Sequence, residues 1–268
     1  MQRRPFLQKL TLFSTAVFSI PLDILSKTIQ NEPKKLRFVV ASDGHFGQPN
    51  TDYTRTHSEL MESINKEEQV DFVVFNGDLI HDNPTLMPQV KLYYDALKSP
   101  YFVTRGNHDR VSNQEWLRIW GNPENHAFHA KDGSGIILLN CSNEEGEYLC
   151  GDVTYLKSKL EEYTTLSHVF VFIHISQNDW TRHGVKCDEL LETISNYSNV
   201  KAVFHGHDHD VDGIMINRGK PYLWDGHFGG SWGNPFHTYR VVEILEDGKT
   251  ITYLKTVKDG TILNGHSL

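Results

Sequence analysis

Five runs of consecutive apolar residues recur along the chain, each with the length of a strand and with polar or turn-forming residues at its ends. The runs are LRFVVASDGH from Leu36, DFVVFNGD from Asp71, PYFVTRGNHD from Pro100, HVFVFIH from His168 and KAVFHGHDH from Lys201. Unbroken apolar runs of this kind are typical of strands that are covered on both faces. Segments with helical character separate them, at 56–68, 86–98, 113–120, 152–163 and 188–196. This alternation of strand and helix predicts an α/β layered fold.

The pattern changes after Val211. The stretches GIMINRGKPYLWDG and HTYRVVEILEDGKTITYLKTV predict antiparallel hairpins, with a tight turn at Asp247-Gly248 in the second. No internal repeat or low-complexity tract interrupts the chain. We therefore expect one domain over residues 34–268.

The first 30 residues form a separate segment, in which the pair Arg3-Arg4 precedes a moderately apolar stretch at 10–25. This order is typical of a secretory signal, and the RRPFL run resembles a twin-arginine export signal. The apolar stretch is only 16 residues long and contains Pro21 and Asp23, so we do not expect a permanent membrane span. The segment predicts export to the periplasm. The alternative is that it forms the first amphipathic helix of a cytoplasmic protein.

Composition is that of a globular protein able to bury a core, with 38% hydrophobic and 22% charged residues. The net charge of −8 argues against stable, sequence-independent binding of nucleic acid, because such binding needs a basic face. The three cysteines are too few and too scattered for a disulfide framework. Free thiols are expected, with a bridge between Cys141 and Cys150 as the alternative.

A residue able to bind a metal ion stands at the end of every one of the five runs. The set comprises Asp43, His45, Asp78, Asn107, His174, His207 and His209. Each of them alone has an ordinary explanation as a turn residue, a cap or a buried histidine. Ligand sites in open α/β sheets form beyond the carboxyl ends of the strands, so we expect the five ends to meet at one rim. Imidazole, carboxylate and amide ligands together favour Mn, Fe, Zn or Co over Ca.

Five ordered blocks contain these residues: Asp43-x-His45, Gly77-Asp78, Gly106-Asn107-His108-Asp109, His174 and Gly206-His207-x-His209. As a set they resemble the calcineurin-like metallophosphoesterases, and the resemblance covers about residues 36–209. It is strongest toward the small single-domain bacterial branch, which is similar to the class III cyclic-nucleotide phosphodiesterases. The resemblance implies an α-β-β-α sandwich with two mixed sheets and the metal site at the carboxyl ends of the strands. It also implies hydrolysis of a small-molecule phosphate diester or monoester by a metal-bridging hydroxide.

The resemblance further implies two divalent or trivalent transition-metal ions. The first ion would be bound by Asp43, His45 and His209, the second by Asn107, His174 and His207, and Asp78 would bridge both. A bridging carboxylate is a compact way to hold two cations about 3.5–4 Å apart. His205 is not used by the family, so we expect it to have a structural or supporting role.

His108 is the residue that the resemblance assigns to stabilise or protonate the leaving oxygen. We expect Asp109 to accept a hydrogen bond from its imidazole, which would favour the protonated form. Many relatives carry an acidic residue three positions after the bridging aspartate, where this chain has His81 followed by Asp82. This departure leaves the substrate side of the site undefined.

Four aromatic residues lie in segments expected to be loops near the rim: Trp180, Trp224, Trp232 and Phe236. Ordinary packing in the core or the hairpins is the preferred interpretation, and stacking on a base or aryl group is the alternative. The alternative to an enzyme is a non-catalytic metal-binding scaffold on the same fold. The presence of the whole ligand set together with His108 favours the enzyme.

Overall fold

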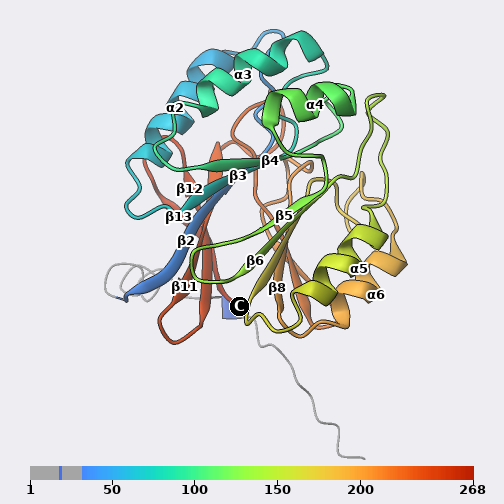
Figure 1. Cartoon of the computed structure of the whole chain (residues 1–268). Coiled ribbons are helices and arrows are strands. Elements are labelled where there is room, and N and C mark those ends of the chain that lie inside the picture. Colours follow the sequence, from blue (N-terminus) through green and yellow to red (C-terminus); the bar gives the residue numbers. More distant parts are fainter. Residues whose placement is uncertain (1–17, 20–31) are drawn as a thin grey trace, which may run out of the picture.

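The computed structural model describes residues 18–19 and 32–268, and the chain folds there into two β-sheets packed face to face (Figure 1). The predicted export segment lies outside the described residues apart from a two-residue strand. The first sheet has the order β1 (Phe18–Ser19), β13 (Ile262–Ser267), β12 (Thr250–Thr256), β11 (Thr238–Leu245), β2 (Lys34–Ala41), β3 (Phe72–Asn76) and β4 (Tyr101–Thr104). The second has the order β5 (His126–His129), β6 (Gly135–Leu139), β7 (Val169–Ile173), β8 (Val200–His205), β10 (Lys220–Trp224) and β9 (Ile214–Asn217).

Both sheets are mixed. Strands β2, β3 and β4 are parallel to one another, whereas β11 joins β2 in antiparallel register. Strands β6, β7, β8 and β10 are parallel, and β5 and β9 add antiparallel edges. The C-terminal hairpins thus extend the sheets of the preceding α/β part, which confirms the predicted α/β class with two mixed sheets.

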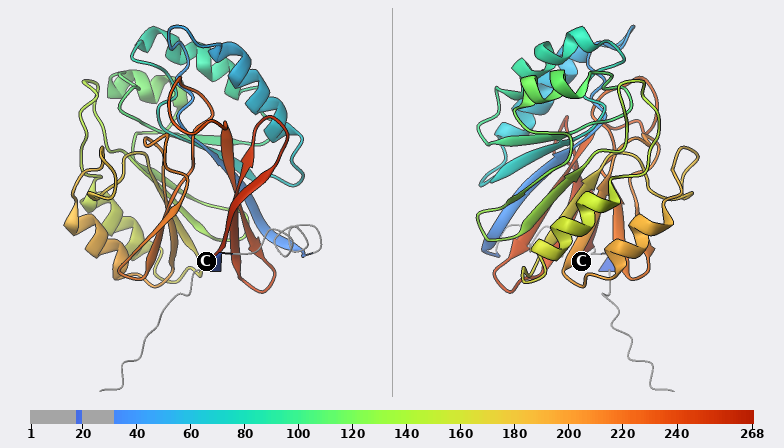
Figure 2. Two further views of the ribbon diagram at one scale, coloured as in Figure 1. Left: turned by 180° about the vertical axis from the view of Figure 1, so that it is seen from behind. Right: turned by 45° about the vertical axis from the view of Figure 1, so that its right-hand side comes forward.

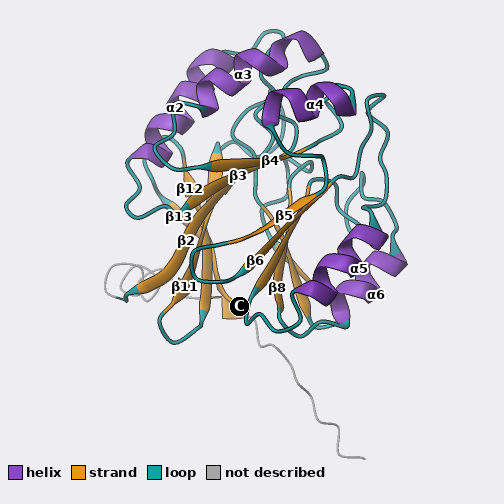
Figure 3. Cartoon of the chain, in the orientation of Figure 1, coloured by secondary structure: helices purple, strands orange, loops and turns teal. Residues whose placement is uncertain are grey.

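Helices cover the outer face of each sheet, as the views in Figures 2 and 3 show. The first sheet is covered by α2 (Tyr53–Asn65), the short 3-10 helix η1 (Pro84–Leu86), α3 (Met87–Tyr94) and α4 (Asn113–Trp120). The second is covered by α5 (Val153–Glu162) and α6 (Asp188–Ser195). Separate buried clusters join the helices to their sheets, which gives the order α-β-β-α.

Strand β2 shows how the apolar runs produce this layering. Successive side chains of a strand point to opposite faces. Phe38 and Val40 pack between the two sheets, whereas Val39 and Ala41 pack under the helices. All four are fully buried. A strand covered on both faces has no need of polar alternation, and the sequence therefore shows an unbroken apolar run.

Polar residues set the helix starts. The side chain of Asp52 accepts a hydrogen bond from the Arg55 amide at the start of α2, and Ser112 accepts one from the Glu115 amide at the start of α4. Such caps satisfy amides that have no partner inside the helix. The cap at Asp52 begins α2 at Tyr53, three residues earlier than the sequence pattern predicts.

The strands end earlier than predicted. Strand β2 ends at Ala41, β3 at Asn76, β4 at Thr104, β7 at Ile173 and β8 at His205, so the metal-competent residues lie just beyond the strands in loops. Strands β5 and β6 were not anticipated. The antiparallel turn at Asp247-Gly248 is confirmed, because it joins β11 to β12.

The expectation of free thiols holds for Cys141 but not for the other two cysteines, and the alternative bridge between Cys141 and Cys150 is wrong. Cys150 forms a disulfide with Cys187, with their Cα atoms 5.7 Å apart, and Cys141 is buried as a free thiol. The two partners lie 37 residues apart in the sequence, and only the folded arrangement of their loops brings them together. Among the described residues, no helix combines the length and the apolar composition that crossing a membrane requires.

Candidate metal centre

Loops after the carboxyl ends of β2, β3, β7 and β8 bring the predicted residues together in two adjacent groups. One group contains Asp43, His45 and His209, and the other contains Asp78, His174 and His207. Within each group, one ligand atom per residue lies within 4.8 Å of the others. The division is the one that the resemblance implies for two ions.

Asp78 lies between the two groups. Its Oδ2 atom is 3.2 Å from His174 Nε2 in its own group and 3.6 Å from His45 Nε2 in the other. Asp43 Oδ1 lies 3.2 Å from His209 Nε2. Asp78 is therefore the carboxylate placed to contact two ions at once.

The backbone is bent to present these side chains. Asp43, His45, Asp78 and His207 all have positive φ angles, between 46° and 68°. Residues other than glycine in this left-handed region each carry a cost of about 1–3 kcal/mol, and such residues cluster at functional sites. This bending also explains why the strands end before the site, because a left-handed residue cannot continue a strand.

Backbone amides hold the two carboxylates. The amide of His207 lies 3.0 Å from both carboxylate oxygens of Asp43, and the amide of His108 donates to Asp78 Oδ1 at 2.9 Å. Gly106 allows this approach, because a Cβ atom at that position would lie 2.1 Å from Asp78 Oδ1. The GNHD loop therefore needs glycine for its close packing against the bridging aspartate.

Hydrogen bonds through Nδ1 direct the other ring nitrogen toward the site. His174 donates from Nδ1 to the carbonyl of Asn76 at 2.6 Å, and His209 donates from Nδ1 to the carbonyl of Trp232 at 3.2 Å. In both rings the Nε2 atom is left to act as a ligand, the arrangement typical of metal-binding histidines. His205 donates to the Ile173 carbonyl and is fully buried behind the site, as expected for a supporting residue.

The buried carboxylates create a strongly negative potential. Burial alone would lower the pKa of the His174 imidazole, yet the charges of Asp78 and Asp43 raise it to about 10. Burial opposes ionisation of the two carboxyl groups, but the charge of His174 holds the pKa of both below the usual range. Burial and the charge of His174 lower the pKa of His207 to about 4. The site thus favours positive charge at its centre and a neutral imidazole at His207.

Three polar atoms of the candidate ligands are buried without a hydrogen bond among the described residues. They are Oδ1 of Asn107 and the Nε2 atoms of His174 and His207. A buried polar atom without a partner costs about 1–3 kcal/mol. A cation bound in the second group would satisfy the two histidine nitrogens, and the Asn107 oxygen is the amide ligand that the resemblance implies there, so the donor set fits a metal ion.

His108 lies at the rim of the site, with 23% of its side chain exposed. Its Nδ1 atom is 3.0 Å from Asp82 Oδ1, which also contacts Arg110. The prediction that Asp109 accepts this hydrogen bond is wrong. Asp109 is fully buried and accepts from the amides of Ile80 and Gly106 instead, so it braces the loop.

His81 fills the position where many relatives have an acidic residue. Its Nδ1 atom lies 3.1 Å from Nδ1 of His45, and its ring stacks on His108 with a centroid distance of 4.9 Å. An imidazole thus takes the contact to His45.

Sequence reasoning missed a buried network beneath the site. Asn76 Nδ2 donates to Asp225 at 3.0 Å, and Asp225 pairs with Arg240 at 3.3 Å. All three are fully buried, and they join β3 and β11 of the first sheet to the end of β10 in the second. The only signal in the sequence is the arginine inside the apolar run TYRVVEIL.

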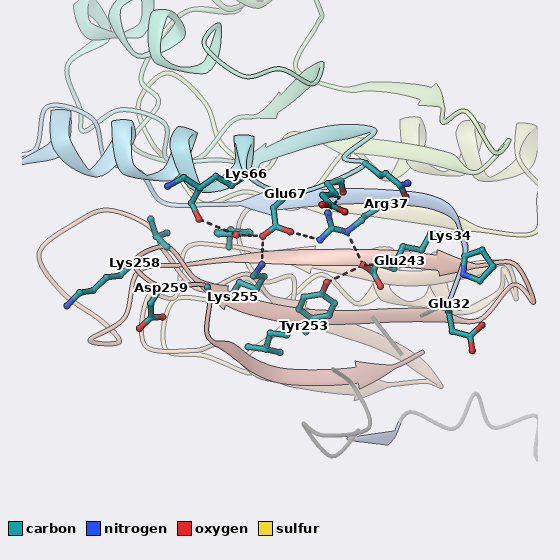
Figure 4. A pocket seen from close by; sticks show the side chains of 18 residues that line it. Glu32, Lys34, Arg37, Lys66, Glu67, Glu243, Tyr253, Lys255, Lys258 and Asp259 are labelled. Carbon is teal, nitrogen blue, oxygen red and sulfur yellow. Dashed lines mark hydrogen bonds and ion pairs between the residues drawn. The ribbon is translucent and has the colours of Figure 1, made fainter. Parts of the chain in front are cut away.

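A separate cavity of about 890 Å³ lies beside the amino-terminal end of β2, at the opposite end of that strand from Asp43. Figure 4 shows Arg37 between Glu67 and Glu243, with Lys255 on Glu67 and Tyr253 on Glu243. Arg37 Nε lies 2.9 Å from Glu243. The charges in this cavity compensate one another, which is typical of a structural ion network.

Residues 36–211 match the family model described as calcineurin-like phosphoesterase. The chain belongs to the calcineurin-like phosphoesterase family. Its match includes every residue of the two candidate ligand groups and ends just after His209. A comparison with curated protein sequences finds no significant match.

Solved structures share the fold of this family member. A dimetal phosphatase from Danio rerio superposes with a TM-score of 0.67 at 14% identity, covering 86% of this chain and 99% of that one. Purple acid phosphatase PPD1 from yellow lupin (Lupinus luteus) seeds superposes with a TM-score of 0.66 at 14% identity, covering 87% and 53%. The NAD nucleotidase of Haemophilus influenzae gives 0.52 at 12% identity, covering 85% and 53%. At these identities the likeness concerns the fold.

Proposed function

We propose that the chain is a binuclear metal-dependent phosphoesterase that hydrolyses a small-molecule phosphate monoester or diester. The observation that carries the proposal is the position of Asp78 Oδ2, within 3.2–3.6 Å of a histidine Nε2 in each of the two ligand groups. The family supports the reaction class. A dimetal phosphatase and an NAD nucleotidase share the fold.

The mixture of imidazole, carboxylate and amide oxygen suits Mn, Fe, Zn or Co. Asp43, His45 and His209 would hold the first ion, Asn107, His174 and His207 the second, and Asp78 both. When bound, such ions neutralise charge on a phosphoryl group and lower the pKa of water. Neutral imidazole is the ligand form, so metal binding should weaken as the pH falls through the range in which histidines take up protons.

The remaining residues of the site have roles set by their exposure. His108 is hydrogen-bonded to Asp82 at the rim and belongs to neither of the groups built on Asp43 and Asp78, although one of its ring nitrogens also lies within 4.8 Å of those of His45 and His81. Because the two carboxylate-containing groups would hold the ions, His108 is the group that would give a proton to a leaving oxygen. Asp82 orients its ring through Nδ1. Asp109 keeps the loop in place from below.

Metal analysis after loading with Mn, Fe or Zn tests the proposal, combined with turnover of bis-aryl phosphodiesters and aryl phosphomonoesters. We expect about two ions per chain and hydrolysis of at least one ester class. Asp78→Asn should lower the content of both ions and abolish turnover, since the Asp78 carboxylate is the ligand proposed to be shared by the two ions.

His205→Ala is the matched control, because His205 lies in the same histidine-rich segment, at the end of β8, and its Nδ1 atom contacts a backbone carbonyl behind the site. It should keep wild-type metal content. A stoichiometry of one, or equal metal loss in both variants, would contradict the binuclear assignment. Two bound ions without turnover of either ester class would support the non-catalytic scaffold instead.

We also propose that the protein is exported, through the twin-arginine segment at its amino terminus. The disulfide between Cys150 and Cys187 supports this proposal, because disulfides persist in oxidising compartments such as the periplasm and are rare in the cytosol. Fractionation of cells that produce the full chain tests it.

A further inference from the structure

Trp232 lies over the first ligand group and is still 44% exposed. Its ring stacks on the imidazole of His209 with a centroid distance of 4.3 Å and an interplanar angle of 8°. Its centroid is 4.9 Å from that of His45, with the rings tilted by 54°. One face of the indole is therefore occupied by a candidate ligand, and exposed indole surface remains at the rim of the site.

The loop that carries Trp232 is built around His209. The Trp232 carbonyl accepts from His209 Nδ1, and the Asn234 amide donates to the His209 carbonyl at 2.9 Å. Gly233 has a φ of 100°, and a Cβ atom there would lie 2.3 Å from the Cβ of His209. Only glycine permits this approach, so the indole is held in place before any ligand arrives.

The other aromatic candidates have ordinary packing roles. Trp224 belongs to β10 instead of a loop, is 3% exposed and donates from Nε1 to Asp208. Trp180 packs on Tyr222 with a centroid distance of 4.8 Å. Phe236 is exposed but lines a different cavity, with Arg55 and Lys258 among others.

Trp232 instead lines a cavity that reaches the candidate metal centre at two of its ligands. The cavity has a volume of about 370 Å³, and its lining includes Trp232, His207 and His209, with Trp180 and His183 among others. The indole therefore offers a flat surface to the organic portion of a substrate whose phosphoryl group reaches the ligand groups. Large aromatic surface left in water is unfavourable, and stacking of a flat ring removes it.

We propose that Trp232 is a specificity-determining residue, whose exposed face stacks on a flat aromatic or heteroaromatic ring in the alcohol portion of the phosphate ester. The inference rests on the proposed function and deepens it by naming the substrate class. Stacking on an aromatic side chain changes affinity by about tenfold when the side chain is removed. The effect belongs in KM, because the ring lies away from the reacting bond.

Benzyl and cyclohexylmethyl phosphate form the test pair, each also prepared as its methyl diester. Both leave as primary alkoxides of similar size, and only benzyl has a flat ring. We expect the wild-type protein to prefer benzyl. Trp232→Ala should lower kcat/KM for benzyl about tenfold through KM with little change for cyclohexylmethyl, and Trp232→Phe should retain most of the preference. Phe236→Ala is the matched exposed-aromatic control and should behave as wild type.

Calorimetry on the metal-loaded protein measures the binding of benzylphosphonate and cyclohexylmethylphosphonate. This measurement tests stacking on Trp232 independently of hydrolysis. If neither ester is hydrolysed, the proposed function fails, while a tighter Kd for benzylphosphonate that disappears in Trp232→Ala still supports stacking. Equal Kd values for the two phosphonates overturn the inference. Loss of metal ions in Trp232→Ala also overturns it, because the indole would then serve only to hold His209.

Discussion

Replacing His108 by alanine separates proton transfer from metal binding. The imidazole lies outside the two ligand groups, and its ring is anchored at the rim by the 3.0 Å contact from Nδ1 to Asp82. Its main-chain amide donates to Asp78, and alanine keeps this amide. His108→Ala should therefore bind two metal ions and remain folded.

The expected loss follows from the role of the proton. General acid catalysis typically contributes about 10²–10⁴-fold, so turnover of an ester with an alkoxide leaving group should fall by that factor. A nitrophenolate leaves without protonation, and its turnover should fall far less. The ratio of the two losses, and not either loss alone, measures the proton transfer.

Asp82→Asn should reduce turnover less than His108→Ala, because it removes only the partner of the imidazole. The Asp82 side chain is 42% exposed and that of His108 23%, and an ion pair this open to water contributes about 0–1 kcal/mol. The alkoxide ester should therefore lose at most about fivefold on this substitution. Asp109→Asn, which alters a buried loop brace instead, should reduce stability.

Steady-state kinetics on an alkyl and a nitrophenyl ester, with metal analysis of each variant, provide the measurement. The general-acid role is refuted if His108→Ala loses equal activity on both esters while keeping its metals. Equal losses would mean that His108 orients the phosphate or stabilises the transition state.

Three further predictions concern the rest of the chain. The disulfide between Cys150 and Cys187 ties the loop of Tyr148 to the loop of His183, and both of these rings contact His207. Replacing both cysteines by serine should therefore raise KM in steady-state kinetics, while metal analysis should show unchanged metal content. Changing both arginines at positions 3 and 4 to lysine, outside the described residues, should leave folded, active protein in the cytoplasm on fractionation; unchanged export would point to the general secretory route. Burial lowers the pKa of His57 from 6.5 to about 4. Between these pH values the unfolded chain binds a proton at this residue and the folded chain does not, so the free energy of unfolding decreases as the pH falls from 6.5 to 4. Urea titrations should show the wild type losing up to about 3 kcal/mol more than His57→Gln between pH 6.5 and 4; parallel losses would contradict this.

Much of the site could be predicted from the sequence. Apolar runs such as HVFVFIH define buried strands, and polar residues directly after them must lie at the carboxyl edge of the sheet. These features depend on neighbours in the chain, and the sequence displays them directly. The division of the ligands between two ions, with Asp78 bridging, was implied only by the resemblance to a family, and the structure places Asp43 and Asp78 in two adjacent groups.

The tertiary structure decided the contacts between loops. Asp109 is the neighbour of His108 in the sequence, whereas Asp82 lies 26 residues away, and only the packing of one loop on another makes Asp82 the partner of the imidazole. Cys150 meets Cys187 for the same reason. Trp224 is buried at the end of β10, whereas the loop of Trp232 returns to the metal centre and stacks the indole on His209. The local pattern of apolar and polar residues indicates where a strand ends. The contacts between distant loops depend on the packing of the two sheets and on residues with positive φ angles, and the hydrophobic pattern of the sequence reveals neither.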